Sequence, residues 1–194
     1  VGNYSAFGSH LVVIDTIPPT VPIPTSNEIT SNDTPTWTWI QVQDAVSYEV
    51  VLNNIPQGEQ TENTFTTSTK LTDGVHEIRV RAKDAVGNYS AYGSHIVIVD
   101  LTAPNIPVPN TDSPTNNNKP LWIWNAIHDA VLYEVTLDGV IQGTQNKTTF
   151  KPSFSLTDGE HEIKVRAKDE VGNFSDYGVN VVLIDTTAPS VPSP

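Results

Sequence analysis

The sequence predicts an all-β protein built from two tandem antiparallel β-sandwiches. Two observations indicate this class: a stretch of sequence that returns after 85 positions, and short segments in which apolar and polar residues alternate. A third is that no segment shows the apolar period of an amphipathic helix. Turn residues recur about every 8 to 12 positions, a spacing typical of a sandwich of some seven strands per repeat.

The repeat is clearest at Val80–Ser90, which returns as Val165–Ser175, and its second half also opens the chain. We therefore expect residues 1–16 to be the last strand and joint of a preceding repeat. The first full repeat is expected at 17–101, the second at 102–186, and the start of a following joint at 187–194. Because the chain opens within a repeat, we interpret it as a fragment whose targeting signals lie outside it.

In chain order, each repeat begins with a proline-marked joint. Residues 20–24 are extended but interrupted by proline, which suits an edge strand, and the polar run 26–33 is expected to form a turn. Strands are expected at 35–40 and 46–52, with weaker ones near 55 and at 64–66. A long alternating strand at 76–83, a turn at 84–88 and a last strand ending near Asp100 complete the repeat.

Period-2 alternation places Trp37 and Trp39 on one face of their strand, as it does Trp122 and Trp124. Aromatic faces can stack on sugar rings, but paired tryptophans on a central strand more often fill the space between two sheets, so we expect core residues. His76 and His161 occupy inward positions and are expected to be buried structural residues. Ser90 and Ser175 have no positioned base within the repeat, which argues against a nucleophile.

Composition narrows the function classes. The chain has 22 Asp and Glu against 10 Lys and Arg, a formal charge of −12, and neither Cys nor Met. Disulfides, cysteine zinc sites and thiol nucleophiles are therefore excluded, and the acidity argues against nucleic acid and anionic membrane surfaces as partners. No apolar run approaches the ~20 residues of a membrane-spanning helix. Cations are the natural counterparts of such a chain.

Threading the strands through a sandwich brings several oxygen-bearing side chains to one end of each repeat. In the second repeat these are Asp100, Asp129, Asp169 and Asn173; in the first they are Asp15, Asp44, Asp84 and Asn88. Carboxylates and backbone carbonyls are the ligands that Ca²⁺ accepts, so the cluster predicts a calcium site at each joint. The alternative is that the Asp bonds local amides in an ordinary turn and that each joint Asp is solvated.

Several motifs together resemble a known family. They are the tryptophan strand, Leu71-x-x-Gly74-x-His76-x-Ile78-x-Val80-x-Ala82, Asp84-x-x-Gly87-Asn88-x-Ser90, and the Asp-Thr-Thr-Ala-Pro joint at 185–189. The chain is similar to the tandem bacterial immunoglobulin-like repeats of very large secreted surface adhesins, which resemble fibronectin type III modules. Many members are extended, calcium-stiffened stalks. The resemblance implies immunoglobulin-like or fibronectin type III-like sandwiches and an extracellular location at the cell surface. One departure is that His76 and His161 replace the tyrosine common in such strands.

We therefore expect a structural and non-catalytic role, spacing a distal binding domain from the cell, with Ca²⁺ as the suspected cofactor. Neighbouring repeats of the same chain, and possible self-association, are the expected partners. Two alternatives remain open: a carbohydrate- or protein-binding module, and a spacer of an extracellular polysaccharide-active enzyme. The unpaired strand at 1–14 is expected to be mobile or to pair with the edge of a neighbouring chain.

Overall fold

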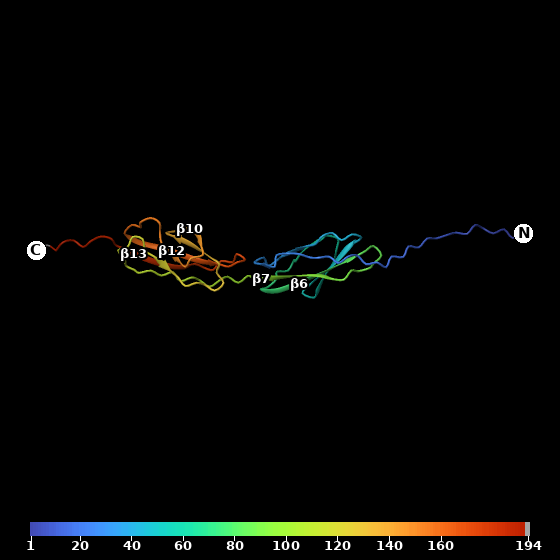
Figure 1. Cartoon of the computed structure of the whole chain (residues 1–194), viewed down its shortest axis with the longest axis horizontal. Helices are drawn as coiled ribbons and strands as arrows, with labels where there is room; N and C mark the ends of the chain where they lie inside the picture. Colours follow the sequence, from blue (N-terminus) through green and yellow to red (C-terminus); the bar gives the residue numbers. More distant parts are fainter. Residues whose placement is uncertain (193–194) are drawn as a thin grey trace. The chain divides into compact units, whose positions relative to one another are not determined.

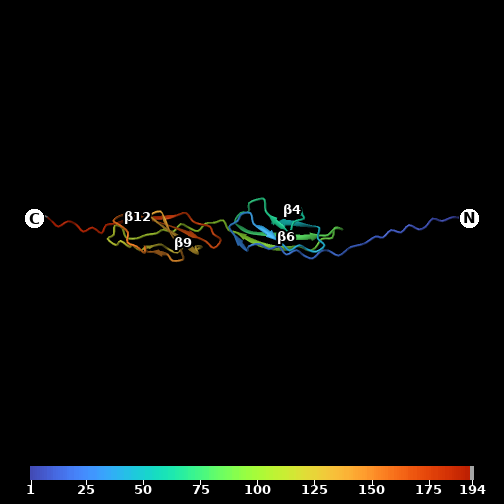
Figure 2. The same ribbon diagram turned by 90° about the horizontal axis from the view of Figure 1, so that it is seen from above.

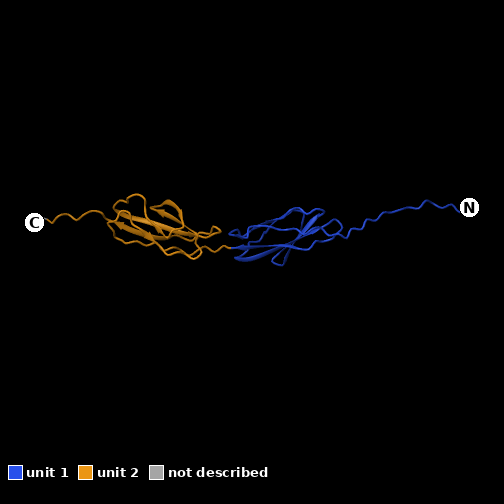
Figure 3. Ribbon diagram, in the orientation of Figure 1, with its two compact units in different colours: residues 1–99 blue, residues 100–194 orange. Residues whose placement is uncertain are grey.

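The computed structural model describes residues 1–192; the last two positions of the predicted joint at 187–194 lie outside the described residues. The chain divides into two compact units, residues 1–99 and 100–194 (Figure 3). The described residues contain thirteen strands and no helix, which confirms the all-β class. A helix long and apolar enough to cross a membrane is accordingly absent from this part of the chain.

Unit 1 packs a five-stranded sheet against a two-stranded one. The larger sheet has the order β1-β7-β6-β3-β4. Its strands are β1 (Ile29–Thr30), β7 (Gly93–Val99), β6 (Gly74–Lys83), β3 (Ser47–Leu52) and β4 (Ile55–Gln60). The smaller sheet pairs β2 (Thr36–Thr38) with β5 (Thr64–Thr66). Figure 2 shows β4 and β6 within this unit. All pairs are antiparallel except β1 and β7, which run parallel with Ile29 opposite Ile98.

Unit 2, in which Figure 1 labels β10, β12 and β13, repeats this arrangement with a four-stranded sheet of order β10-β9-β12-β13. Its strands are β10 (Val140–Gln145), β9 (Leu132–Leu137), β12 (Gly159–Lys168) and β13 (Gly178–Ile184). The smaller sheet pairs β8 (Trp122–Ile123) with β11 (Thr149–Phe150). The place of β1 is taken by a single parallel bridge between Thr115 and Ile184.

Each unit has its own hydrophobic core between its two sheets. Trp37 is fully buried and stacks on Phe65 at 6.2 Å between ring centroids, while Trp39 meets Tyr48 edge-on at 5.3 Å. Both tryptophans of unit 2 are buried in the same way, so the prediction of core tryptophans is confirmed. Alternate residues along β6 are buried, and each fully buried valine or isoleucine contributes about 1.5–3 kcal/mol.

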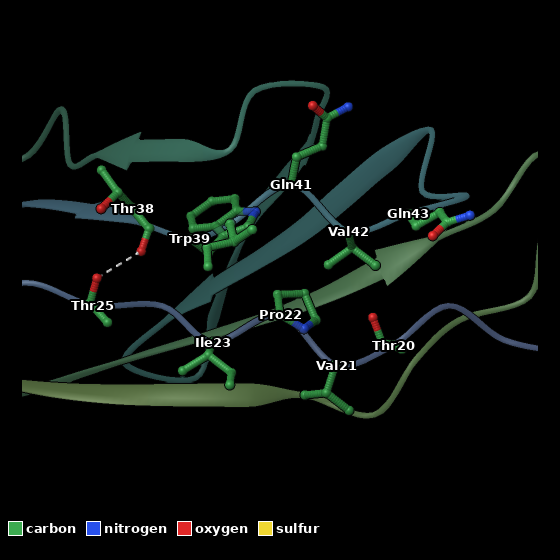
Figure 4. Close-up of a pocket in the computed structure, with 11 residues that line it drawn as sticks. Thr20, Val21, Pro22, Ile23, Thr25, Thr38, Trp39, Gln41, Val42 and Gln43 are labelled. Carbon is green, nitrogen blue, oxygen red and sulfur yellow. Dashed lines mark hydrogen bonds between the residues drawn. The ribbon is translucent and has the colours of Figure 1, made fainter.

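The prediction of an edge strand at residues 20–24 is wrong. This segment forms no ladder; the residue that follows it, Thr25, makes an isolated bridge to Thr38 with two backbone hydrogen bonds of 2.8 and 3.0 Å. Proline has no amide proton to donate, so Pro22 and Pro24 contribute buried apolar surface instead. Figure 4 shows the segment running beside the stretch from Thr38 to Gln43. The predicted turn at 26–33 is also corrected, because it contains β1.

This first segment lies against the last strand of its unit. The main-chain carbonyl of Pro22 faces Gly93, so that a Cβ added to Gly93 would lie only 1.7 Å from the carbonyl oxygen. In unit 2 the Pro107 carbonyl faces Gly178, and a Cβ added to Gly178 would likewise lie 1.7 Å from its oxygen. A glycine is therefore required at this position of each unit for the close approach of two backbones.

The opening segment, residues 1–16, forms no strand. Its Val12 and Ile14 correspond by the repeat to Val97 and Val99, which are buried in unit 1, yet both are largely exposed here. The sequence of a last strand is thus not sufficient for burial when the partner strands are absent. Mobility of this segment, or its pairing with another chain, stays a prediction.

Candidate functional site: the Asp-Gly-Asn turn and the joint

The turn that follows β6 is organised around one buried carboxylate. Asp84 Oδ1 accepts backbone N–H bonds from Val86 at 3.0 Å, Gly87 at 2.8 Å and Asn88 at 2.8 Å. Asp84 Oδ2 accepts a fourth bond, from Asn88 Nδ2 at 2.8 Å. Gly87 has a φ of 99°, a conformation that glycine adopts readily. The spacing Asp-x-x-Gly-Asn is what places these amides around the carboxylate.

These hydrogen bonds set the charge state of Asp84. Burial alone would raise the pKa of this carboxyl, but the bonds from the Asn88 side chain and from the three backbone amides outweigh burial and hold the pKa below its usual value. Asp84 is therefore ionised at neutral pH, and its negative charge is compensated by dipoles of its own turn.

Unit 2 reproduces this turn. Asp169 Oδ1 accepts bonds from the backbone N–H of Gly172 at 2.7 Å and Asn173 at 2.8 Å, and Oδ2 accepts Asn173 Nδ2 at 2.8 Å. Both repeats thus contain the same arrangement of amides around the carboxylate. Asp84 and Asp169 thus bond the amides of their own turns, as in the ordinary-turn alternative to a calcium site.

The asparagine of each turn also holds the joint that leads into the unit. Asn88 Nδ2 donates to the main-chain carbonyl of Asp15 at 3.1 Å, and Asn173 Nδ2 donates to that of Asp100 at 2.9 Å. We call each of these hydrogen bonds the Asn–Asp contact. The carboxylates of Asp15 and Asp100 do not join it; each accepts the backbone N–H two residues later, at 3.0 and 3.1 Å. The contact therefore fixes a backbone position of the joint on the unit that follows.

The remaining predicted ligands, Asp44 and Asp129, are exposed. Asp44 occupies a left-handed backbone conformation with φ of 66°, and the Asp129 carboxylate is hydrogen-bonded to Nδ1 of the adjacent His128. Within residues 1–192 no group of three or more His, Asp or Glu side chains is arranged to hold a metal ion. The Asp169 carboxylate already accepts hydrogen bonds from Gly172 and Asn173, which would compete with Ca²⁺ for its lone pairs. Calcium binding stays a prediction.

The histidines differ between the units. His76 is buried, with Nδ1 2.8 Å from the Asn53 amide nitrogen and Nε2 2.8 Å from the Thr72 carbonyl oxygen. His161 is only partly buried, and its ring lies between two acceptors: the Asp138 carboxylate at 2.7 Å and the Thr157 carbonyl at 2.9 Å. Burial would lower the pKa of His161, but Asp138 and the Thr157 carbonyl outweigh burial and raise it.

The two serines have structural roles. Ser90 Oγ accepts the backbone N–H of Ala82 at 2.9 Å and donates to the carbonyl of Ala91 at 2.8 Å. In unit 2, Ser175 Oγ accepts from Ala167 at 2.9 Å and donates to Asp176 at 2.8 Å. Each serine hydroxyl therefore donates its proton to a backbone carbonyl and not to a side-chain base, as a nucleophilic serine would.

A groove of about 530 Å³ lies in unit 1 between the first segment and the stretch after β2 (Figure 4). Apolar side chains line most of it, among them Val21, Ile23 and Ile40. Trp39 also lines it but is only 4% exposed, so it presents no face on which a sugar ring could stack.

Two features of the joint were missed at the sequence level. One is the bond from the Asn side chain to the joint carbonyl, and the other is the glycine at the start of each last strand. Both carry a signal, since Asn3, Asn88 and Asn173 recur at one repeat position, as do Gly8, Gly93 and Gly178. The signal gives the position of these residues but not their partners.

Comparison with known proteins gives two sequence relatives among bacterial enzymes. Exoglucanase B of Cellulomonas fimi is 28% identical over 201 residues, covering 92% of this chain and 18% of the relative. Exoglucanase A of the same organism is 28% identical over 213 residues, covering 98% of this chain and 24% of the relative. The chain thus spans about a fifth of the length of these curated relatives.

Solved structures at low identity share the fold. The fibronectin(III)-like modules of Clostridium thermocellum CbhA are 15% identical, with a TM-score of 0.50 over 84% of this chain and 94% of theirs. The FN1–FN3 domains of chicken CNTN1 are 12% identical, with a TM-score of 0.53 over 86% and 66%. A 1.5-MDa bacterial ice-binding adhesin is 15% identical, with a TM-score of 0.50 over 83% and 62%. These likenesses confirm the sandwich.

A family model described as "Bacterial Ig-like domain" matches residues 23–101 and again residues 107–186. The two matches are in tandem and fall one in each full repeat. They confirm the resemblance inferred from the motifs, and modules of this kind are non-catalytic. Since the matches cover most of its length, the chain belongs to the bacterial immunoglobulin-like domain family, of which it carries two consecutive copies.

Proposed function

We propose that the chain is a pair of spacer modules in an extracellular bacterial protein, with a structural role of separating the parts that flank it. The family membership and the sequence relatives support this role. Each unit has a hydrophobic core of its own, so each can act as a spacer module by itself. The acidic surface, at a formal charge of −12, favours solubility and disfavours adhesion to anionic surfaces.

The Asn–Asp contact is the observation that carries the proposal. Asp100 directly follows Val99, the last residue of β7, and its carbonyl is bonded to Asn173 of unit 2. Asp100 is thus the first residue after β7 and is already hydrogen-bonded within unit 2. A spacer works by limiting the freedom of its connections, and a hydrogen bond at the first residue after the strand supplies that limit.

The test is a distance measurement across the joint. The chain has no cysteine, so Thr61→Cys and Asn146→Cys introduce two spin labels at equivalent exposed positions. We expect Asn173→Ala to broaden the distance distribution measured by pulsed electron resonance. Asn88→Ala is the matched control, because it breaks the contact to Asp15 and leaves Asp100 held. Equal distributions for Asn173→Ala and the parent chain would contradict the proposal.

Within this role we propose a stalk that spaces the distal binding domain of a cell-surface adhesin, and as second candidate a spacer of an extracellular polysaccharide-active enzyme. The second is favoured by the two exoglucanase relatives. Further repeats of the same period around this chain in its parent polypeptide would support the stalk. A catalytic domain in that polypeptide would support the enzyme spacer. Sedimentation velocity tests self-association: a concentration-independent monomer excludes it.

We also propose that Ca²⁺ binds at the joints. The Asp100 carboxylate and the exposed Asp129 carboxylate are the oxygens that would hold it, with Asp169 after loss of some turn bonds. Calorimetric titration should give saturable binding in the parent chain and weaker binding in Asp129→Asn. Heats equal to those of dilution, with unchanged melting in chelator, would leave these aspartates as turn residues.

A further inference from the structure

The residues that follow the last strand of unit 2 are held on the unit by one carboxylate. β13 ends directly before Asp185, whose backbone N–H donates to the Thr115 carbonyl at 3.0 Å. Asp158 Oδ1 accepts the backbone N–H of Thr186 at 3.0 Å and the hydroxyl of the same residue at 2.6 Å. Asp158 Oδ2 accepts the hydroxyl of Thr187 at 2.8 Å. Two consecutive residues beyond Asp185 are thus tied to a single side chain.

The register of the sheet explains why Asp158 lies beside this exit. Gly159, the first residue of β12, pairs with Ile184, the last residue of β13. Asp158 directly precedes Gly159, so the antiparallel register places it next to the residues that leave β13. The hydroxyl and backbone N–H of Thr186 and the hydroxyl of Thr187 outweigh burial and hold the pKa of the Asp158 carboxyl below its usual 3.8. Asp158 is therefore an ionised acceptor at neutral pH.

The segment held in this way contains the repeat position that both earlier joints use. Asp185 recurs at the period of 85 residues as Asp100 and as Asp15. The main-chain carbonyls of those two residues accept the Asn–Asp contact, from Asn173 and Asn88 respectively. Asp185 is exposed at the equivalent place of the joint that leaves unit 2.

We propose that Asp158 is a positioning residue, which presents the Asp185 carbonyl to a following immunoglobulin-like unit that carries an Asp-x-x-Gly-Asn turn. With Thr186 and Thr187 held on unit 2, the Asp185 carbonyl has a defined place before the partner binds, and binding then costs less conformational entropy. This inference rests on the proposed spacer role and deepens it, because it names the group by which unit 2 holds its own side of a joint.

The three joints of the chain supply matched substitutions. The two positions after the joint aspartate are occupied, in chain order, by the pairs Thr16–Ile17, Leu101–Thr102 and Thr186–Thr187. A hydroxyl at both positions thus occurs only at the joint that leaves unit 2. Thr186→Leu and Thr187→Ile each replace a hydroxyl by a side chain that the chain itself uses at that position, whereas Thr186→Ser keeps the hydroxyl.

Nuclear magnetic relaxation of the whole chain tests the holding step. We expect backbone order parameters of about 0.85 at Thr186 and Thr187 in the parent chain, the value of rigid backbone, and values below about 0.6 in Asp158→Ala. The double variant Thr186→Leu, Thr187→Ile should also lower them, and Thr186→Ser should keep them. Asp73→Ala is the matched control, because Asp73 has the same repeat position in unit 1. Unchanged order in both Asp158→Ala and the double threonine variant would overturn the proposal, even if one of them disturbs the fold.

A three-unit chain tests the presentation step. In this chain a copy of residues 103–185 follows Thr187, which keeps the repeat period and adds a third Asp-Gly-Asn turn. Spin labels at Asn146→Cys and at the equivalent position of the added unit report the distance across the new joint. We expect Asp158→Ala to broaden the distance distribution and Asp73→Ala to leave it unchanged. A distribution that Asp158→Ala does not alter would also overturn the proposal. The spacer role is tested at the other joint by Asn173→Ala, so the failure of either is distinguishable from the failure of the other.

Discussion

Replacement of Gly178 by alanine tests whether the first segment of a unit is seated against its last strand. An added Cβ would lie 1.7 Å from the Pro107 carbonyl oxygen, 2.8 Å from its carbonyl carbon and 3.0 Å from Pro109 Cδ. Real Cβ atoms essentially never approach other atoms within 3.0 Å, so the backbone at Pro107 must move away by more than 1 Å. Neither group is the flexible end of a side chain, and therefore neither can yield cheaply.

The expected loss follows from this geometry. Overpacking of a well-packed interior costs about 1–3 kcal/mol, and displacement of this segment also strains the backbone bonds between Asn110 and Ile123, at 2.8 and 2.9 Å. We expect Gly178→Ala to lower the free energy of unfolding of unit 2 by about 3 kcal/mol. At roughly 4–8 °C per kcal/mol for a domain of this size, its melting temperature falls by about 12–24 °C.

Differential scanning calorimetry of the whole chain measures this loss. Gly8→Ala is the matched control, since Gly8 occupies the same repeat position in the opening segment and has no atom within 4 Å of an added Cβ. Gly93→Ala should destabilise unit 1 instead of unit 2. If Gly178→Ala melts within about 2 °C of the parent chain, too little to represent even 1 kcal/mol, the contact with Pro107 is not part of the folded unit.

Three further predictions concern charge and hydrogen bonding. The pKa of His161 in the folded chain is raised above its ordinary 6.5. Protonation of His161 therefore stabilises unit 2 below about pH 6.5, and this stabilisation is lost as the pH rises through the pKa of the folded state. Asp138→Asn should flatten the pH dependence of the melting temperature of unit 2. The pKa of Asp84 in the folded chain is lowered from 3.8. The ionised carboxylate therefore stabilises unit 1 above about pH 4, and this stabilisation is lost as the pH falls through the pKa of the folded state. Urea unfolding of Asp84→Asn should show a less stable unit 1 whose stability lacks this acid-dependent loss. Ser175→Ala leaves the buried N–H of Ala167 without its acceptor and should cost about 1–3 kcal/mol in urea unfolding, and a smaller loss would show that another group takes the bond.

The sequence was sufficient to predict the features that rest on periodicity. Alternation along β6 and around Trp37 determined which side chains are buried, because a strand has only two faces and one of them must be covered. The Asp-x-x-Gly-Asn spacing likewise limited Asp84 to a turn or a metal site, since only a few groups lie within reach of its carboxylate.

Contacts between segments distant in sequence could not be predicted in this way. The proline-interrupted pattern of residues 20–24 predicted an edge strand, and it did not reveal that the Pro22 carbonyl lies against Gly93 instead. The short β1 lies in a polar run without an apolar alternation, and its pairing depends on β7, which lies far along the chain. The partner of Asn88 is a main-chain carbonyl, which every residue possesses, so no side-chain signal marks it.

The parallel pairing of β1 with β7 has a consequence under mechanical tension. A pull on the two ends of unit 1 acts before β1 and after β7, at opposite ends of two strands that run in the same direction. Tension therefore slides these strands along each other and loads their hydrogen bonds together, whereas antiparallel neighbours pulled from one end would separate one bond at a time. Unit 2 has a single parallel bridge at this place, so along this seam it should yield at a lower force than unit 1.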